Sequence, residues 1–276
     1  MADNTYFNSI KDWRKAYEEK LGAPDGWLSI SGLYWLKEGD NLIGTGHPSQ
    51  VLLPYGAGPA NTAAINLQGT HLKLSVSDDA QMTCNDQPVS SMEIKLNQYG
   101  SSDWFYLKDV KFAVIQRGTR YGVRVYDQNN PERRKYLNVR WFAINDALRV
   151  QAKYHLLETP LMLTIVNVLG DSSEEPCEGY VEFSIGEKVC QLYPLSIDDG
   201  KGLWFMFKDG TNNKLTYSGG RFLTADGPKD GLVTLDFNKA HNPPCAYTHF
   251  ATCPLPPDMN RLPVDIIAGE MAFPMQ

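Results

Sequence analysis

The segment GWLSISGLYWLKEGDNLIG, residues 26–44, decides the fold expected for the first half of the chain. Its apolar residues form short alternating runs, and Gly, Asp and Asn residues separate these runs. The same pattern continues to about Arg117. Alternation with a period of two is typical of strands that have one buried face, and closely spaced turn residues indicate antiparallel pairing. We therefore predict a β-sandwich over residues 25–122.

A helix is expected before this segment. In YFNSIKDWRKAYEEKLG, residues 6–22, aromatic and aliphatic side chains such as Tyr6 and Trp13 recur at helical spacing, with charged residues between them. Gly22 then ends the pattern. This predicts an amphipathic helix in a unit of its own, residues 1–24, with its aromatic stripe in a core.

A second β unit is expected after the polar stretch YDQNNPERRKYL, in which we place the connection between domains. The strand-like runs that follow are LRVQAKYHL, LMLTIVNVL, YVEFSI, KVCQLYPL, GLWFMFKD and GLVTLDFN. They predict a second antiparallel β-barrel or sandwich over residues 123–276, covered by a Pro-rich lid. The fold class is therefore mostly β.

Composition excludes several classes of function. The 276 residues carry a net charge of −6, and no Lys/Arg cluster offsets it, which argues against nucleic-acid binding. No apolar run is long enough to span a membrane, and the first residues lack the pattern of a secretion signal. Five cysteines, an odd number, indicate reduced thiols. We expect a cytoplasmic protein, and the oligomeric state is left open.

Three stretches in the first half resemble the β-sandwich of forkhead-associated domains, which bind phosphothreonine. These are LKEGDNLIGTGHPSQVLLP, GTHLKLSVSDDAQMTCNDQPV and LKDVKFAVI, and the similarity covers about residues 32 to 116. The functional residues of that family are missing here, because Thr45 replaces the arginine that holds the phosphate. The segment ANTAAI keeps only Asn61 and Thr62, and Ser49 is expected in an ordinary turn. Since charge-assisted bonds from arginine supply most of the hold on a phosphate, the resemblance implies the scaffold without phosphopeptide binding.

The chain as a whole resembles a bacterial family known as domain of unknown function number 1684. The resemblance is carried by GLYWLKEGDNLIG, NVRWFAI, IVNVLGD, YSGGRFL, LDFNKAHNPPCAY and CPLPPDMNRLPVDIIAGE, which span nearly all of the sequence. It implies no activity. His241 stands where the family pattern leads us to expect a tyrosine, which argues against an obligatory ligand at this position.

The Pro-rich segment AHNPPCAYTHFATCPLPPDMNRLP, residues 240–263, contains Cys245 and Cys253 with His241 and His249. Four such donors could form a zinc site, but the spacing is irregular, so we expect no metal or other cofactor. Cys245 could alternatively act as a nucleophile, with either histidine as its base and Asp236 or Asn242 orienting that base. A buried structural thiol is favoured over both. The Asp-rich loops at residues 198–200 and 208–214 are interpreted as turns rather than calcium loops.

A set of polar residues lies in or beside apolar, strand-like sequence of the second unit and is expected to gather in one enclosed place. The set comprises Tyr217, Arg221, Asp236, Asn238, Asn242, Asn260, Arg261 and Glu270. A buried guanidinium requires a partner. Arg221 could bind a ligand in a pocket lined by aromatic residues. Alternatively, it forms an internal Arg–Asp or Arg–Glu network that holds the Pro-rich lid. The second interpretation is slightly favoured.

Three functions from different classes follow. The first is binding of a small anionic or amphipathic ligand in a pocket around Arg221. The second is hydrolysis by Cys245 with His241, His249 or a zinc ion. The third is protein interaction through the first β unit, without phosphopeptide binding.

Overall fold

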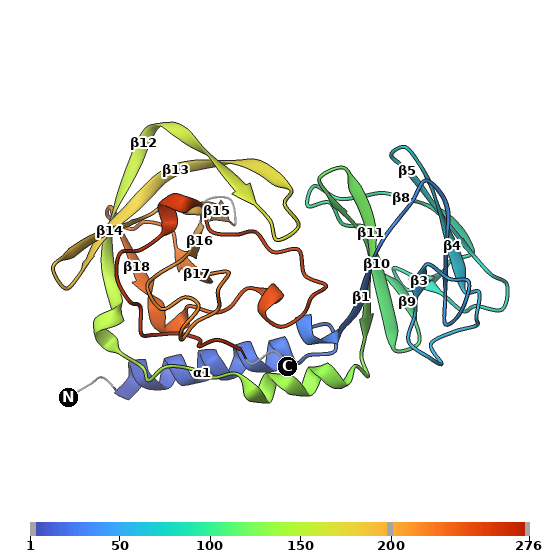
Figure 1. Cartoon of the computed structure of the whole chain (residues 1–276), viewed down its shortest axis with the longest axis horizontal. Helices are drawn as coiled ribbons and strands as arrows, with labels where there is room; N and C mark the ends of the chain where they lie inside the picture. The colour runs from blue at the N-terminus through green and yellow to red at the C-terminus, as the bar shows by residue number, and fades with distance from the viewer. Residues whose placement is uncertain (1–3, 198–200, 274–276) are drawn as a thin grey trace. The chain divides into compact units, whose positions relative to one another are not determined.

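The computed structural model describes residues 4–197 and 201–273 of the chain (Figure 1). The Asp-Asp-Gly turn expected at residues 198–200 lies outside them. The chain divides into two compact units: an N-terminal unit, Leu21–Lys135, and a C-terminal unit that combines Met1–Lys20 with Tyr136–Gln276. Nearly all strand pairs in both units are antiparallel, so the mostly β class is confirmed.

The N-terminal unit contains two sheets. One has the order β1-β11-β10-β9-β6-β7, and the other has the order β3-β2-β4-β5-β8, in which β2 and β3 are parallel. The strands are β1 (Ile30–Trp35), β2 (Gly39–Gly44), β3 (Val51–Leu52), β4 (Ala63–Gln68), β5 (His71–Val76), β6 (Thr83–Cys84), β7 (Gln87–Pro88), β8 (Ser91–Ile94), β9 (Phe105–Leu107), β10 (Val110–Arg117) and β11 (Arg120–Asp127). The 3-10 turn η1 (Trp27–Ser29) precedes them, and η2 (Pro131–Asn138) follows.

The core of the N-terminal unit follows from the alternation in its sequence. In β5, Leu72 and Leu74 are buried while His71 and Lys73 are exposed. The inward side chains of both sheets join in one apolar cluster, which includes Ile65 and Phe112. A β-sandwich is the arrangement in which two sheets each bury one face in this way.

The expected boundary between residues 122 and 123 falls inside β11. This strand pairs along its whole length with β10 and also pairs with β1, so it belongs entirely to the N-terminal unit. The division lies instead between Lys135 and Tyr136. This division falls within the polar stretch YDQNNPERRKYL, whereas the expected numerical boundary falls inside a strand.

The described part of the C-terminal unit contains one α-helix and two sheets, with orders β14-β13-β12-β18 and β15-β16-β17. No closed barrel forms among the described strands, and side chains of both sheets meet in one apolar core. The elements are α1 (Asn4–Leu21), β12 (Arg149–Val166), β13 (Ser172–Ile185), β14 (Lys188–Leu192), β15 (Leu195–Ile197), β16 (Gly202–Phe207), β17 (Arg221–Asp226) and β18 (Leu232–Asp236). The 3-10 turns are η3 (Asp146–Leu148), η4 (Phe237–Lys239), η5 (Pro244–Ala246) and η6 (Asp258–Asn260).

Helix α1 belongs to the C-terminal unit rather than to a unit of its own. It runs along one side of the sheets of that unit (Figure 1). Ile10 is fully buried, and the guanidinium of Arg14 donates to the carbonyl oxygens of Phe142 and Asn238. An amphipathic helix of this length is stable only when its apolar face is covered, and residues after 136 cover it. No described helix is long and apolar enough to cross a lipid bilayer.

The Pro-rich segment, residues 240–263, contains no strand, as expected from its missing backbone donors. It includes η5 and η6 and joins its surroundings through isolated bridges, such as the one between Phe222 and His241. Side chains of the two sheets, including Phe205, Leu235 and Phe237, form the main apolar core of the unit.

Candidate functional site

Arg221, the first residue of β17, is completely buried. Its Nη2 forms an ion pair with Asp209 at 2.8 Å and donates to the carbonyl oxygen of Ile266 at 2.9 Å. Its Nη1 donates to the carbonyl oxygens of Ala268 and Glu270. These partners belong to the chain itself, so Arg221 holds residues 266–270 against the sheet. The geometry corresponds to the internal network that was weighed against a ligand.

The glycine before Arg221 allows its own backbone to lie close to that of Phe207. Gly220 has a φ of +96°, and a Cβ atom there would lie 2.7 Å from the carbonyl oxygen of Phe207. Glycine adopts this conformation without strain. The close contact at Gly220 is therefore with the protein's own backbone.

Glu270 forms the centre of a second buried cluster. Both of its carboxylate oxygens accept hydrogen bonds at 2.6 Å from the Tyr247 hydroxyl, and Oε2 also accepts one at 2.8 Å from the Asn242 backbone. The Tyr247 hydroxyl also lies 2.9 Å from that of Tyr17. Burial raises the pKa of Glu270 to about 7, although these hydrogen bonds and Arg221 oppose the shift. The carboxyl group is therefore a structural element that titrates near neutral pH.

The rest of the expected polar set is divided between other places. The Asn260 side chain is fully buried and bonds to backbone groups of Tyr193 and Met206. Arg261 is exposed. Tyr217 lies beside Cys245. The structure thus brings together parts of the set, in separate clusters, rather than the whole set in one pocket.

The Cys/His segment shows neither a metal cluster nor a Cys–His pair. Among the described residues, no group of three His, Cys, Asp or Glu side chains is placed to hold a metal ion. Among the described residues, the side-chain partners of the Cys245 sulfur are Tyr217 and Cys253, and neither is a histidine. His249 is exposed, and His241 bonds to the carbonyl oxygen of Lys239. The nucleophile hypothesis therefore lacks its expected base.

In the N-terminal unit, the hydroxyl groups at the positions of phosphate-binding residues are directed to the protein backbone. Thr45 donates to the carbonyl oxygens of Gly58 and Pro59, and Ser49 donates to that of Ala60. Thr62 donates to Pro59 at 2.9 Å. Asn61 is exposed. No cationic side chain takes the place of the missing arginine in these contacts.

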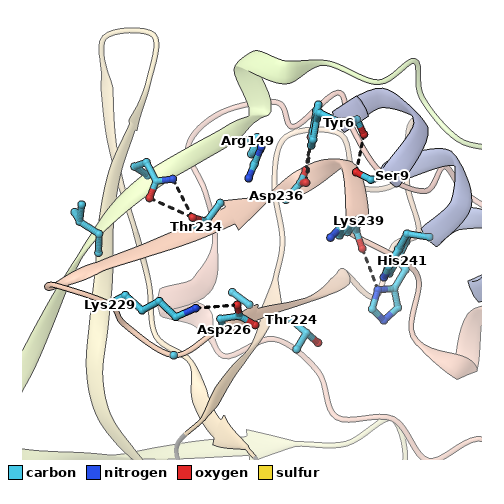
Figure 2. Close-up of a pocket in the computed structure, with 15 residues that line it drawn as sticks. Tyr6, Ser9, Arg149, Thr224, Asp226, Lys229, Thr234, Asp236, Lys239 and His241 are labelled. Carbon is cyan, nitrogen blue, oxygen red and sulfur yellow. Dashed lines mark hydrogen bonds and ion pairs between the residues drawn. The ribbon is translucent and has the colours of Figure 1, made fainter. Parts of the chain in front are cut away.

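A polar pocket of about 640 Å³ lies in the C-terminal unit, between α1, β12, β17 and β18 (Figure 2). Its lining comprises Tyr6, Ser9, Trp13, Arg149, Gln151, Thr224, Ala225, Asp226, Gly227, Lys229, Leu232, Thr234, Asp236, Lys239 and His241. Figure 2 shows Tyr6 and Ser9 reaching in from α1, with Asp226 and Lys229 at the opposite side. The volume is in the range of small-molecule sites, roughly 300–1,000 Å³.

Hydrogen bonds over long sequence distances fix one wall of this pocket. The Tyr6 hydroxyl donates to both oxygens of Asp236, at 2.9 and 3.1 Å. The fully buried Asn238 donates to the Tyr6 oxygen, to Asp236 and to the Asn145 carbonyl. Burial and the neighbouring carboxylate raise the pKa of Tyr6, which keeps the phenol protonated. Asp236 and Asn238 were expected site residues, and the structure places Asp236 in the lining.

The charges in the pocket lining are mostly positive. Lys229 pairs with Asp226 at 3.6 Å, and both side chains are exposed. The Arg149 guanidinium lies 4.9 Å from the centre of the Tyr6 ring. In the part of the chain that the structure describes, neither Arg149 nor Lys239 forms an ion pair.

His241 contributes a neutral imidazole. Burial lowers its pKa to about 4, so the ring is uncharged at neutral pH. The rings of Trp13 and Tyr17 lie 6.1 and 5.0 Å from it. The expected tyrosine is thus replaced by another ring that packs among aromatic side chains.

The sequence did not identify Tyr6, Arg149 or Lys239 as site residues. Tyr6 was assigned to the aromatic stripe of the first helix, and Arg149 lay in the strand-like run LRVQAKYHL without an assignment of its own. Arg149 and Asp236 face each other in the pairing of β12 with β18. Only this pairing, between residues far apart in the chain, places their side chains at the same pocket.

The family model described as "Protein of unknown function (DUF1684)" matches residues 134–271, half of the chain. This match covers the second half, whereas the resemblance was expected over nearly the whole sequence. No curated protein matches the chain.

Several solved structures are similar to parts of the chain. One is the solution NMR structure of an uncharacterized protein from Haloarcula marismortui, gene locus rrnAC0354, at 29% identity; it covers 51% of this chain and 80% of that one, with a TM-score of 0.42. Another is the FhaA FHA domain in complex with the intracellular domain of Rv3910, at 21% identity, covering 34% and 96%, with a TM-score of 0.25. The Rv0020c FHA structure is 23% identical and covers 34% and 90%, with a TM-score of 0.23.

Proposed function

The chain belongs to the DUF1684 family, and from its pocket geometry we propose that its C-terminal unit binds a small anionic ligand. The binding site is the polar pocket between α1, β12, β17 and β18. The observation that carries the proposal is the pair of cations, Arg149 and Lys239, that line one hollow without an ion-pair partner among the described residues.

The charge of the pocket supports an anionic ligand. Three cationic side chains, Arg149, Lys229 and Lys239, face two carboxylates in a chain whose net charge is −6. One carboxylate, Asp226, already pairs with Lys229. The other, Asp236, accepts hydrogen bonds from Tyr6 and Asn238. These bonds weaken its repulsion of an anionic ligand. Hydrogen bonds from guanidinium or ammonium groups to an anion are among the strongest in proteins.

The remaining lining favours a hydrophilic ligand with hydroxyl groups. Ser9, Thr224 and Thr234 contribute hydroxyls, and Gln151 contributes an amide. Gln151 and Thr234 already hydrogen-bond to each other at 2.9 Å, which orients both. The half-buried Trp13 ring, stacked on Tyr17 with centroids 5.5 Å apart, provides a flat apolar edge. A phosphorylated sugar or a hydroxy acid combines these features.

Isothermal titration calorimetry tests this proposal with four probes: inorganic phosphate, citrate, glucose 6-phosphate and uncharged glucose. We expect binding of at least one anionic probe and none of glucose, with affinity that falls as salt rises. Arg149→Gln or Lys239→Gln is expected to weaken that binding about tenfold or more, since each removes a charge-assisted hydrogen bond.

The matched control is Lys214→Gln, which removes an exposed cation of the same unit that does not line the pocket. It should leave the affinity unchanged. Equal affinity of the wild type and both pocket variants, or no binding of any anionic probe, contradicts the proposal.

A further inference from the structure

Two thiols meet in the Pro-rich segment, among residues that do not line the polar pocket. Cys245 and Cys253 lie in one small buried cluster with Ala251, and Tyr217 packs against it. The backbone N–H of Cys245 donates to the Cys253 sulfur at 3.1 Å, and the side chains of the two cysteines hydrogen-bond to each other. Both cysteines are in the thiol form, with exposed fractions of 9% and 5%. Access is thus limited to small molecules.

The backbone around both thiols is held in place. Prolines precede Cys245 and follow Cys253, and each proline has a fixed φ. The turn η5 around Cys245 is closed by hydrogen bonds to the carbonyl oxygens of Pro243 and Pro244. The Cys253 carbonyl oxygen accepts the backbone N–H of Val168 at 2.9 Å. The Cys253 sulfur lies 3.1 Å from the Cys245 backbone nitrogen, and the backbone is held at both cysteines, so the two thiols stay close together.

The hydrogen bonds of Cys245 differ from those of the other buried thiols. The Tyr217 hydroxyl donates to the Cys245 sulfur at 3.5 Å, so donors from Tyr217 and Cys253 converge on one sulfur. They lower the pKa of Cys245 to about 7 against the effect of burial. Cys177 and Cys190 instead donate to carbonyl oxygens, and burial raises the pKa of both, as it does for Cys84. Cys245 is therefore the thiol prepared to react as a thiolate.

We propose that Cys245 and Cys253 are a reversible oxidation site that forms a disulfide with a small peroxide, such as hydrogen peroxide. The Cys245 thiolate attacks one peroxide oxygen, the O–O bond breaks, and the hydroxide that leaves takes up a proton to give water. The Cys253 sulfur then attacks the sulfur of the Cys245 sulfenic acid. The S–S bond forms, the S–O bond breaks, and the oxygen leaves as a second water with the Cys253 thiol proton. Two thiols lose two electrons and the peroxide gains them; a dithiol reductant reverses the reaction.

The first test uses the unmodified full chain. The protein is treated with hydrogen peroxide at pH 7, and its peptides are mapped without reduction. We expect one cross-link, between Cys245 and Cys253, while Cys84, Cys177 and Cys190 remain thiols, and dithiothreitol should restore the reduced form. Absence of this cross-link, or oxidation of the other three cysteines at the same rate, overturns the proposal.

The second test identifies which sulfur reacts first. In Cys253→Ser, the sulfenic acid on Cys245 has no partner and should accumulate, where dimedone labels it; Cys190→Ser is the matched control and should still form the disulfide. The lowered pKa of Cys245 gives it a larger thiolate fraction at pH 7 than an ordinary thiol has, and lower intrinsic nucleophilicity offsets part of this gain. A rate several-fold above that of the other cysteines is expected.

The Tyr217→Phe variant tests whether the Tyr217 hydroxyl activates the Cys245 thiol or only supports the local structure. Loss of the donated hydrogen bond should move the pH of half-maximal reaction upward without preventing the disulfide from forming. A pH profile identical to that of the wild type, or no dimedone label in Cys253→Ser, contradicts the assignment of Cys245 as the attacking thiol.

Discussion

Arg221 is a buried cation whose charge is balanced entirely inside the protein. The pairing itself was expected from sequence, because a guanidinium beside apolar residues requires an acceptor. Its partner, Asp209, was not identified. The loop of residues 208–214 was interpreted as a turn, and it is one: Asp209 also accepts the backbone N–H of Thr211. A residue that satisfies a turn pattern can have a second, tertiary role that the pattern conceals.

Asp209→Asn should lower the free energy of unfolding by about 3–5 kcal/mol, because it leaves the buried Arg221 charge without its carboxylate. The matched control is Asp226→Asn, the same change in the exposed pair with Lys229, which should cost less than about 1 kcal/mol. Urea denaturation of both variants measures the difference. Similar destabilisation by the two substitutions argues against the importance of the buried pair.

The raised pKa of Glu270 predicts how the free energy of unfolding depends on pH. Its pKa in the folded protein is about 7, above the ordinary value of 4.5, because burial disfavours the carboxylate more than the hydrogen bonds from Asn242 and Tyr247 and the nearby Arg221 favour it. The folded state therefore binds more protons than the unfolded state between these values, and this residue's contribution to stability falls as pH rises from 4.5 to 7. The fall is on the order of 3 kcal/mol.

Glu270→Gln, which resembles the protonated carboxyl, should remove this part of the pH dependence. The free energy of unfolding is measured by urea denaturation at pH 5 and pH 7.5 for both proteins. The wild type should lose more stability than the variant over this range. Parallel behaviour of the two proteins would show that Glu270 does not titrate here.

At the scale of elements, the strands and α1 follow from periodicity, but their associations do not. The stripe of α1 predicted a buried face correctly, yet the sequence assigned the helix to a separate unit. A period of 3.6 residues identifies which face is buried and leaves open what covers it. The hydroxyl of Tyr6 bonds to Asp236, a residue 230 positions later.

Ile10→Ala tests the place of α1. Ile10 is fully buried, so the substitution should destabilise the C-terminal unit by about 2–5 kcal/mol and reduce hydrogen-exchange protection in β18. The neighbouring exposed Lys11→Ala should change stability by less than about 0.5 kcal/mol. Unchanged protection of β18 in Ile10→Ala would show that the helix is not part of this unit.

At the scale of the molecule, the two units are not consecutive in sequence. The C-terminal unit takes its helix from the start of the chain, and the N-terminal unit, residues 21–135, is inserted between that helix and the rest. The polar pocket depends on this connectivity, because α1 supplies Tyr6, Ser9 and Trp13 to its lining. A fragment that begins at residue 123 would therefore lack one wall of the candidate site.

The sequence alone determined the mostly β class, the N-terminal helix, the irregular Pro-rich segment and the need of Arg221 for a partner. These properties depend on the order of neighbouring residues, through periodicity, proline and desolvation. The tertiary structure alone decided that Arg221 pairs with Asp209, that Arg149 lies beside Asp236 and that Cys245 contacts Cys253. Each of these pairs is formed by strand pairing or by the path of an irregular loop. Such contacts are selected by the packing of the whole unit, and no local pattern specifies them.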